Sequence, residues 1–121
     1  QFDMSLSTLL DDLEDKGMLD TTLVVAMGEF GRTPKINKTA GRDHYPGAGC
    51  AVLAGGGVKR GLVIGATDSK GTEPATRAWY PEDFAATIYN AMGIDPHTTY
   101  LPRIARPTPI SPGNIIDGLL A

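Results

Sequence analysis

The sequence has a single cysteine, Cys50, among its 121 residues. One cysteine excludes an intrachain disulfide and a cysteine-rich zinc site, and its place in an apolar run predicts a small buried side chain. No apolar stretch approaches the roughly 20 residues of a membrane-spanning helix. Basic residues are few, since 11 Lys and Arg against 14 Asp and Glu give a net charge of −3. Nucleic-acid modules usually carry a basic stripe, so we expect neither a nucleic-acid partner nor a membrane span.

Glycine and proline are abundant instead. The 15 glycines and 9 prolines make up about a fifth of the chain, against about an eighth in an average protein. The apolar share of 41% and the charged share of 21% are ordinary for a globular domain. This composition predicts an ordered chain of short elements joined by many turns.

A first helix is predicted at the amino-terminal end, because apolar residues recur there at helical spacing and Gly17 suits a helix C-cap. The apolar positions are Phe2, Leu6, Leu9, Leu10 and Leu13. The chain begins with Gln1 rather than Met, and it begins inside this helical pattern. We therefore expect a fragment of a longer chain.

Buried strands are predicted from continuous apolar runs. Residues 22–27 are apolar and β-branched without alternation, and residues 51–54 form a second such run. Strands of this kind are typical of parallel sheets covered by helices on both faces. Residues 62–64 predict a third short extended piece.

A second helix is predicted after Pro81, which suits the first helical turn, and Gly93 is expected to end it. The order of helices and strands predicts an α/β fold, with a mostly parallel sheet flanked by helices. Residues 95–121 contain five prolines and predict an irregular tail.

A long polar segment, residues 28–49, follows the first predicted strand. Glu29 lies just beyond the carboxyl end of that strand, where α/β sheets bind their ligands. Loops of this length without secondary structure are usually functional or disordered. We therefore place the candidate site in this segment.

Four side chains of the segment are candidates for metal binding or catalysis. Glu29, Asp43 and His44 are candidate metal ligands, because carboxylate oxygens and imidazole nitrogens bind divalent cations. Arg32, Asp43 and His44 are candidate catalytic residues. The Arg32 guanidinium is suited to bidentate hydrogen bonding with a phosphate or sulfate oxyanion. The alternative is structural: Glu29 and Arg32 form an ion pair, and His44 is a half-buried loop histidine.

Longer motifs carry a family resemblance. They are MGEFGRTP at residues 27–34, GRDHYP at 41–46, AGGGV at 54–58, YPEDFAATIY at 80–89 and MGI at 92–94. With these motifs the whole chain, residues 1–121, resembles the carboxyl-terminal part of the DUF1501 family, bacterial proteins abundant in planctomycetes. That family is similar to the alkaline phosphatase and sulfatase superfamily, so the resemblance implies a sulfatase-like fold.

The resemblance also implies a site. Glu29 matches the superfamily's metal-binding Asp at a strand end, and His44 matches its loop histidine. The next position should hold His or Asn, but here it is Phe30, which cannot ligate a metal. The superfamily's nucleophile, a Ser, Thr or modified Cys, lies upstream of the matching region. A divalent metal such as Zn, Ca, Mg or Mn is expected.

Two functions follow from the resemblance. The first is a metal-dependent hydrolase of phosphate or sulfate esters, acting on a small anionic ester and completed by the remainder of a longer chain. The alternative is a non-catalytic binding or surface-associated protein that retains the fold. Relatives often carry an export signal, so an exported or periplasmic location is expected.

Overall fold

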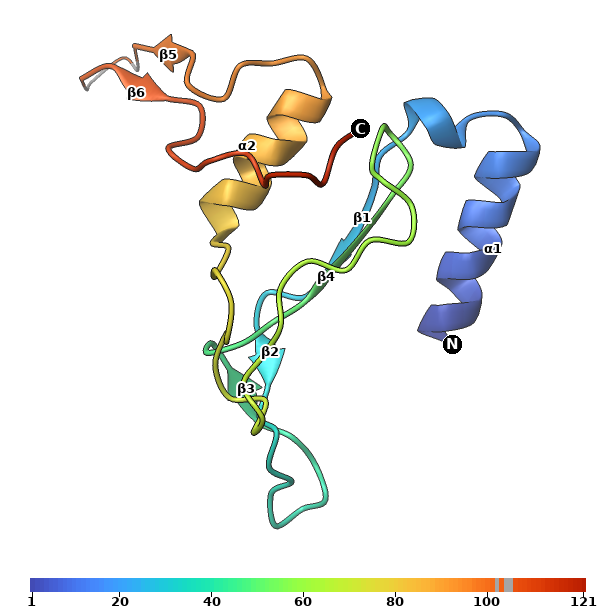
Figure 1. Ribbon diagram of the computed structural model, residues 1–121, viewed down its shortest axis with the longest axis vertical. Helices are drawn as coiled ribbons and strands as arrows, with labels where there is room; N and C mark the ends of the chain where they lie inside the picture. Colours follow the sequence, from blue (N-terminus) through green and yellow to red (C-terminus); the bar gives the residue numbers. More distant parts are fainter. Residues whose placement is uncertain (102, 104–105) are drawn as a thin grey trace. The chain divides into compact units, whose positions relative to one another are not determined.

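The structure is a computed structural model that describes residues 1–101, 103 and 106–121. The chain divides into two compact units, residues 1–78 and 79–121. The first unit contains α1 (Phe2–Asp15), the 3-10 helix η1 (Leu19–Thr21), β1 (Val24–Met27), β2 (Gly31–Arg32), β3 (His44–Tyr45) and β4 (Ala51–Ala54) (Figure 1). The second unit contains α2 (Pro81–Ala91), β5 (Thr99–Tyr100) and β6 (Thr108–Pro109). No helix in the described residues is both long enough and apolar enough to span a bilayer.

The prediction of a mostly parallel sheet flanked by helices is wrong. β1 and β4 form an antiparallel pair in which Val24 lies opposite Ala54 and Met27 opposite Ala51. The other two sheets of the described residues are also antiparallel pairs, β2–β3 and β5–β6. Parallel neighbours need a crossover connection, usually a helix, and residues 28–50 between β1 and β4 contain no helix. The chain therefore returns as an antiparallel partner.

The positions of β1 and β4 agree with the predicted apolar runs, but their burial does not. Met27 is 54% exposed and Val52 is 47% exposed, so these strands are not covered on both faces. Residues 62–64 form no strand, and Val63 is 88% exposed. Cys50 is exposed rather than buried. The apolar runs therefore indicate β-propensity rather than two-sided burial.

The first predicted helix is confirmed as α1. It ends before Gly17, which adopts the left-handed conformation at φ 65° that a glycine tolerates best. No residue of α1 is buried. Its apolar side chains Phe2, Met4 and Leu9 are exposed.

The second predicted helix is confirmed as α2, which has Pro81 in its first turn and is followed by Gly93 at φ 76°. Asp83 and Thr87 are the buried polar side chains of this helix. Asp83 accepts hydrogen bonds from the Tyr80 N–H (2.9 Å) and the Asn114 N–H (2.8 Å). α2 is therefore tied to its own amino-terminal end and to the carboxyl-terminal segment.

The carboxyl-terminal segment packs along α2 within the second unit. Thr87 Oγ1 donates to the Asp83 carbonyl (2.7 Å) and accepts from the Ile116 N–H (2.9 Å). Ser111 Oγ donates to the Glu82 carbonyl at 2.8 Å. We call Asp83, Thr87 and Ser111 the α2 clamp.

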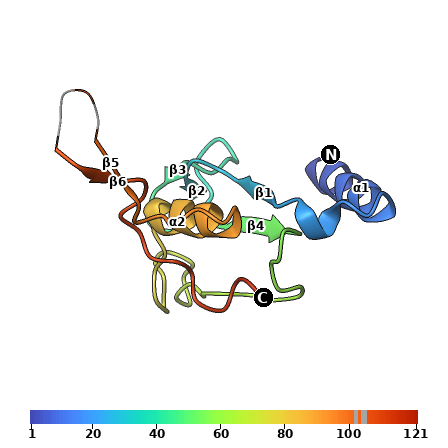
Figure 2. The same ribbon diagram turned by 90° about the horizontal axis from the view of Figure 1, so that it is seen from above.

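The region predicted as an irregular tail, residues 95–121, contains the short β5–β6 pair, whose strands lie side by side in Figure 2. It also supplies two of the buried apolar residues, Ile116 and Leu119. Residues 102 and 104–105 of the predicted tail lie outside the described residues.

Candidate functional site

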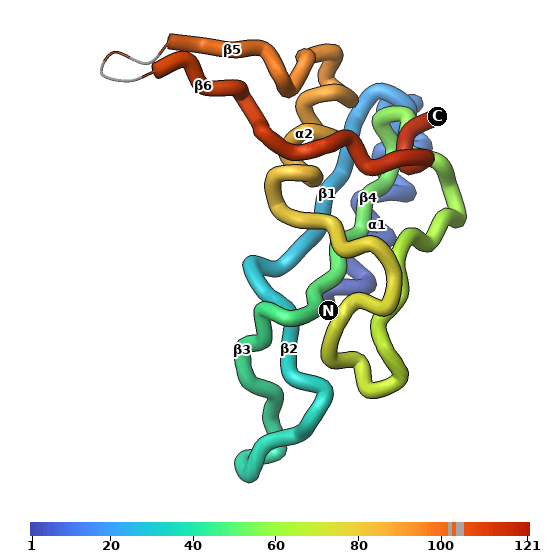
Figure 3. The backbone as a smooth tube through the Cα atoms, turned by 60° about the vertical axis from the view of Figure 1, so that its left-hand side comes forward, coloured from blue at the N-terminus to red at the C-terminus, as the bar shows by residue number. Residues whose placement is uncertain are grey.

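The candidate site lies on the hairpin formed by β2, β3 and the loop between them (Figure 3). Its register places Gly31 opposite Tyr45 and Arg32 opposite His44. Side chains of directly opposite residues lie on the same face of a hairpin. The hairpin therefore brings Arg32 and His44 together on one face.

The loop of the hairpin is held by its own hydrogen bonds. Thr33 donates its N–H to the Asp43 carbonyl at 3.0 Å, and Asp43 donates its N–H to Thr33 Oγ1 at 3.1 Å. Asn37 Oδ1 accepts from the N–H groups of Thr39 (3.0 Å) and Gly41 (2.9 Å). An asparagine that replaces backbone partners in this way is typical of tight turns. The ties keep β2 and β3 in register.

The opposite face of the hairpin packs closely. A Cβ on Gly31 would lie 1.6 Å from the Ala48 carbonyl oxygen, so only glycine fits at this position. Tyr45 donates its hydroxyl to the Thr72 carbonyl at 2.7 Å. These contacts hold one face of the hairpin against Ala48 and Thr72.

Asp68 supports that anchor by binding Thr72. Its carboxylate accepts from the Thr72 hydroxyl (2.7 Å) and the Thr72 N–H (2.6 Å). The Thr72 hydroxyl, followed by the Thr72 N–H, lowers the pKa of Asp68 below its ordinary value of 3.8. The sequence signal for this contact is an Asp four residues before a Thr in a glycine-containing turn.

The exposed face of the hairpin carries a cluster of planar groups. The Phe30 ring stacks on the His44 imidazole with 3.9 Å between ring centroids and 30° between planes. Arg32 places its Cζ 5.7 Å from the centroid of the same ring. Arg32 also donates from Nη1 to the Arg42 carbonyl at 3.2 Å. Phe30 is the residue that the sequence interpretation missed as a member of the site.

The alternative structural interpretation does not describe this arrangement. In the described residues, Glu29 forms no ion pair with Arg32. His44 is exposed and belongs to a strand rather than to a loop. Glu29, Arg32 and Asp43 are exposed as well. The polar groups are therefore accessible to a ligand from solvent.

The predicted metal ligands do not gather into one group. Among residues 1–101, 103 and 106–121, no three His, Cys, Asp or Glu side chains are placed to hold a metal ion. One oxygen of Asp43 accepts the Asn37 side-chain amide at 2.8 Å. His44 has its ring against Phe30. Glu29, Asp43 and His44 thus do not fit a metal site by themselves.

The electrostatics of the loop are positive in an acidic chain. Between β2 and β3 the charged residues are Lys35, Lys38, Arg42 and Asp43, and Arg32 stands at the start. Arg42 uses Nη1 for the carbonyls of Thr33 and Pro34, both at 2.7 Å. The local excess of positive charge favours an anionic ligand.

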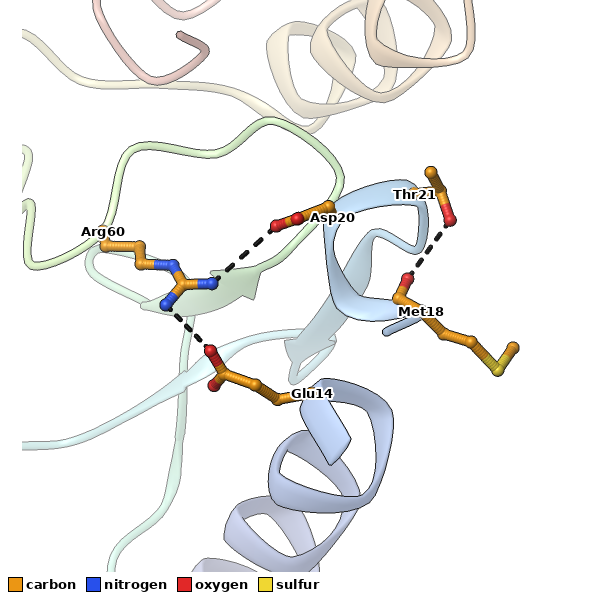
Figure 4. A network of polar contacts seen from close by, with 5 residues as sticks. All are labelled: Glu14, Met18, Asp20, Thr21 and Arg60. Carbon is orange, nitrogen blue, oxygen red and sulfur yellow. Dashed lines mark hydrogen bonds and ion pairs between the residues drawn. The ribbon is translucent and has the colours of Figure 1, made fainter. Parts of the chain in front are cut away.

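A separate shallow hollow lies beside η1 and holds none of the predicted site residues. It is lined by Glu14, Gly17, Leu19, Asp20 and Arg60. The Arg60 guanidinium contacts Glu14 at 3.1 Å and Asp20 at 3.8 Å (Figure 4). All three side chains are well exposed, and exposed ion pairs contribute about 0–1 kcal/mol. One guanidinium faces two carboxylates, so this cluster has a net negative charge and does not match an anionic ligand.

The motif-bearing hairpin and the segments around it place the chain in a family. Residues 1–120 match the family described as "Protein of unknown function (DUF1501)". The chain therefore belongs to the DUF1501 family. No curated protein and no solved structure matches it.

Proposed function

We propose that the β2–β3 hairpin binds the oxyanion of a phosphate or sulfate ester, and that the protein is a hydrolase of such esters. The observation that carries the proposal is the pairing of Arg32 and His44 on one exposed face. Guanidinium groups match the geometry of phosphate and sulfate oxygens. The positive loop charge would attract the same ligands.

Each residue has a role in this proposal. Arg32 would donate to the non-bridging oxygens, which is the standard way to stabilise charge on such a group. His44 would donate an imidazole N–H or transfer a proton. Asp43 would keep the hairpin closed through its backbone contacts with Thr33 and orient the loop through Asn37.

A divalent metal remains part of the hydrolase proposal by donor chemistry, with Zn, Ca, Mg or Mn as candidates. Glu29, Asp43 and His44 are suitable ligand types. They do not form a three-ligand group, so a bound ion would take further ligands from outside these residues. An exported or periplasmic location also remains a prediction.

The second candidate function is oxyanion binding without catalysis. It is favoured by Phe30, which stands beside Glu29 where the superfamily has a metal-binding His or Asn. A protein that lost a ligand there would keep Arg32 for binding and lose the metal-dependent step.

Titration with inorganic phosphate and inorganic sulfate tests the proposal. Arg32→Ala should weaken binding about tenfold, because a hydrogen bond to a charged group contributes about 1.5 kcal/mol. Lys59→Ala removes a positive charge elsewhere and is the matched control. Equal affinity of all three proteins, or no binding to the wild type, would contradict the proposal.

A hydrolysis assay separates the two candidate functions. The intact protein is incubated with p-nitrophenyl phosphate and p-nitrophenyl sulfate, with each candidate metal or with EDTA. Turnover that Arg32→Ala lowers supports the hydrolase. Phosphate binding without turnover under every condition supports the binding protein.

A further inference from the structure

Phe30 is more exposed than a core aromatic residue. It stands immediately before β2 and is 38% exposed. One of its ring faces nevertheless lies against the His44 imidazole, and the Arg32 guanidinium approaches the same ring. The ring therefore contacts the two groups that the proposed oxyanion site requires.

The backbone explains why these side chains meet. Phe30 lies in the bend immediately before β2, and its ring contacts both Arg32 and His44. Arg32 is the cross-strand partner of His44, which brings His44 to the same side. Gly31 and Tyr45 alternate to the other side, where Tyr45 is anchored on Thr72. Register therefore pairs Arg32 with His44, and the bend before β2 brings the Phe30 ring to them.

We propose that Phe30 is a positioning residue that holds the His44 imidazole and the Arg32 guanidinium side by side so that both donate to one oxyanion. This inference rests on the proposed function. An aromatic face carries negative charge density that attracts a guanidinium within about 6 Å. Offset stacking also restricts the orientation of a neighbouring ring. Both effects reduce the freedom that exposed side chains lose when they bind a ligand.

The hydrogen bonds of Arg32 agree with this role. Nη1 donates to the Arg42 carbonyl, which fixes one edge of the guanidinium. A guanidinium carries five N–H donors, so donors remain for a ligand. The Phe30 ring centroid lies 5.7 Å from Arg32 Cζ, while the Arg42 carbonyl accepts from one of the guanidinium nitrogens.

The experiment compares Phe30→Leu with Phe30→Tyr in the full chain. Leucine keeps apolar bulk and loses the aromatic face, whereas tyrosine keeps that face. NMR of the imidazole resonances reports the stack directly, and the chain has only two histidines, so His97 is an internal reference. Ile36→Ala, an exposed apolar residue in the same hairpin, is the control variant.

In the wild type, the His44 ring protons should resonate upfield of those of His97 because they lie over a phenyl face. Phe30→Leu should remove that upfield shift and weaken inorganic phosphate binding about two- to fivefold. Phe30→Tyr should restore both, and Ile36→Ala should change neither.

Three results overturn the inference. An unshifted wild-type His44 rules out the stack. Equal phosphate affinity of the wild type and Phe30→Leu assigns Phe30 a packing role only. A loss that Phe30→Tyr does not recover excludes the aromatic face as the cause. Failure of the proposed function is distinguishable, because wild type that binds no phosphate would still display the shifted His44 resonance.

Discussion

The β2–β3 hairpin and the α2 clamp are both rich in polar side chains, but they use them in opposite ways. In the clamp, Asp83, Thr87 and Ser111 are at most 6% exposed, and each accepts or donates hydrogen bonds to the backbone. In the hairpin, Arg32 and His44 are exposed and converge on one face. A polar group that is buried and satisfied stabilises a fold. Convergent polar groups that face solvent are available for chemistry.

The largest expected effect separates the two regions through two aspartates. Asp83→Ala should lower the free energy of unfolding by about 3 kcal/mol, because two part-buried backbone N–H groups lose their acceptor on a buried side chain. Chemical denaturation followed by circular dichroism measures the loss. Asp43→Ala is the matched variant and should cost less than about 1 kcal/mol, since its partner amide is exposed to water. Equal losses of unfolding free energy in the two variants would contradict the contrast between the α2 clamp and the hairpin.

The next effect concerns the backbone of the hairpin. Gly31→Ala should destabilise the chain by about 2 kcal/mol, because the new Cβ meets the Ala48 carbonyl. It should also abolish the register that pairs Arg32 with His44, so phosphate binding should fall with stability. Gly49→Ala is the control, because its Cβ would be 3.6 Å from the nearest atom, an ordinary contact. A stable Gly31→Ala protein with intact binding would show that the close packing is not required.

A smaller effect is expected at the anchor of the hairpin. Tyr45→Phe removes only the hydroxyl that donates to the Thr72 carbonyl. One neutral hydrogen bond contributes about 1 kcal/mol, and thermal unfolding should report a loss of that size. Tyr100→Phe removes a hydroxyl from an exposed tyrosine and should leave stability unchanged. A Tyr45→Phe protein as stable as the wild type would show that the anchor contributes nothing.

The smallest effect is a pH dependence at Asp68. Its folded-state pKa is lowered, chiefly by the Thr72 hydroxyl, so the unfolded state binds its proton first as the pH falls. The carboxylate therefore contributes stability above its ordinary pKa of 3.8, and this contribution disappears as the pH falls through the lower folded value. Denaturation between pH 6 and pH 3 should show a slightly weaker acid dependence in Asp68→Asn. An unchanged acid dependence would mean that Thr72 does not distinguish the ionised form.

The sequence predicted local features well, because they depend on neighbouring residues. Both helices were located by periodicity and by Pro81 and Gly93, and the strands at residues 24–27 and 51–54 by their apolar runs. The direction of pairing was mispredicted because it depends on how residues 28–50 return, which no local pattern records.

The same limit applies to the candidate site. The shared polar segment placed Arg32 and His44 near each other in the chain, but neither their cross-strand pairing nor the separation of the metal-ligand candidates could be predicted locally. Phe30 was missed because a phenyl ring cannot ligate a metal, and no local pattern places it beside His44. Its contact with His44 depends on the bend before β2 and on the position of β3, and both become visible only in the folded chain.

The pairing of Met27 with Ala51 has a consequence for engineering. These two residues are cross-strand partners, so the segment between them, residues 28–50, leaves one strand and enters the next about 5 Å away. Any antiparallel strand pair offers the same two attachment points. The ties between Thr33 and Asp43 and around Asn37 lie within the segment and would travel with it. The hairpin could therefore be grafted onto another antiparallel strand pair, with the Tyr45–Thr72 hydrogen bond and the neighbourhood of Pro34 and Gly71 lost on transfer.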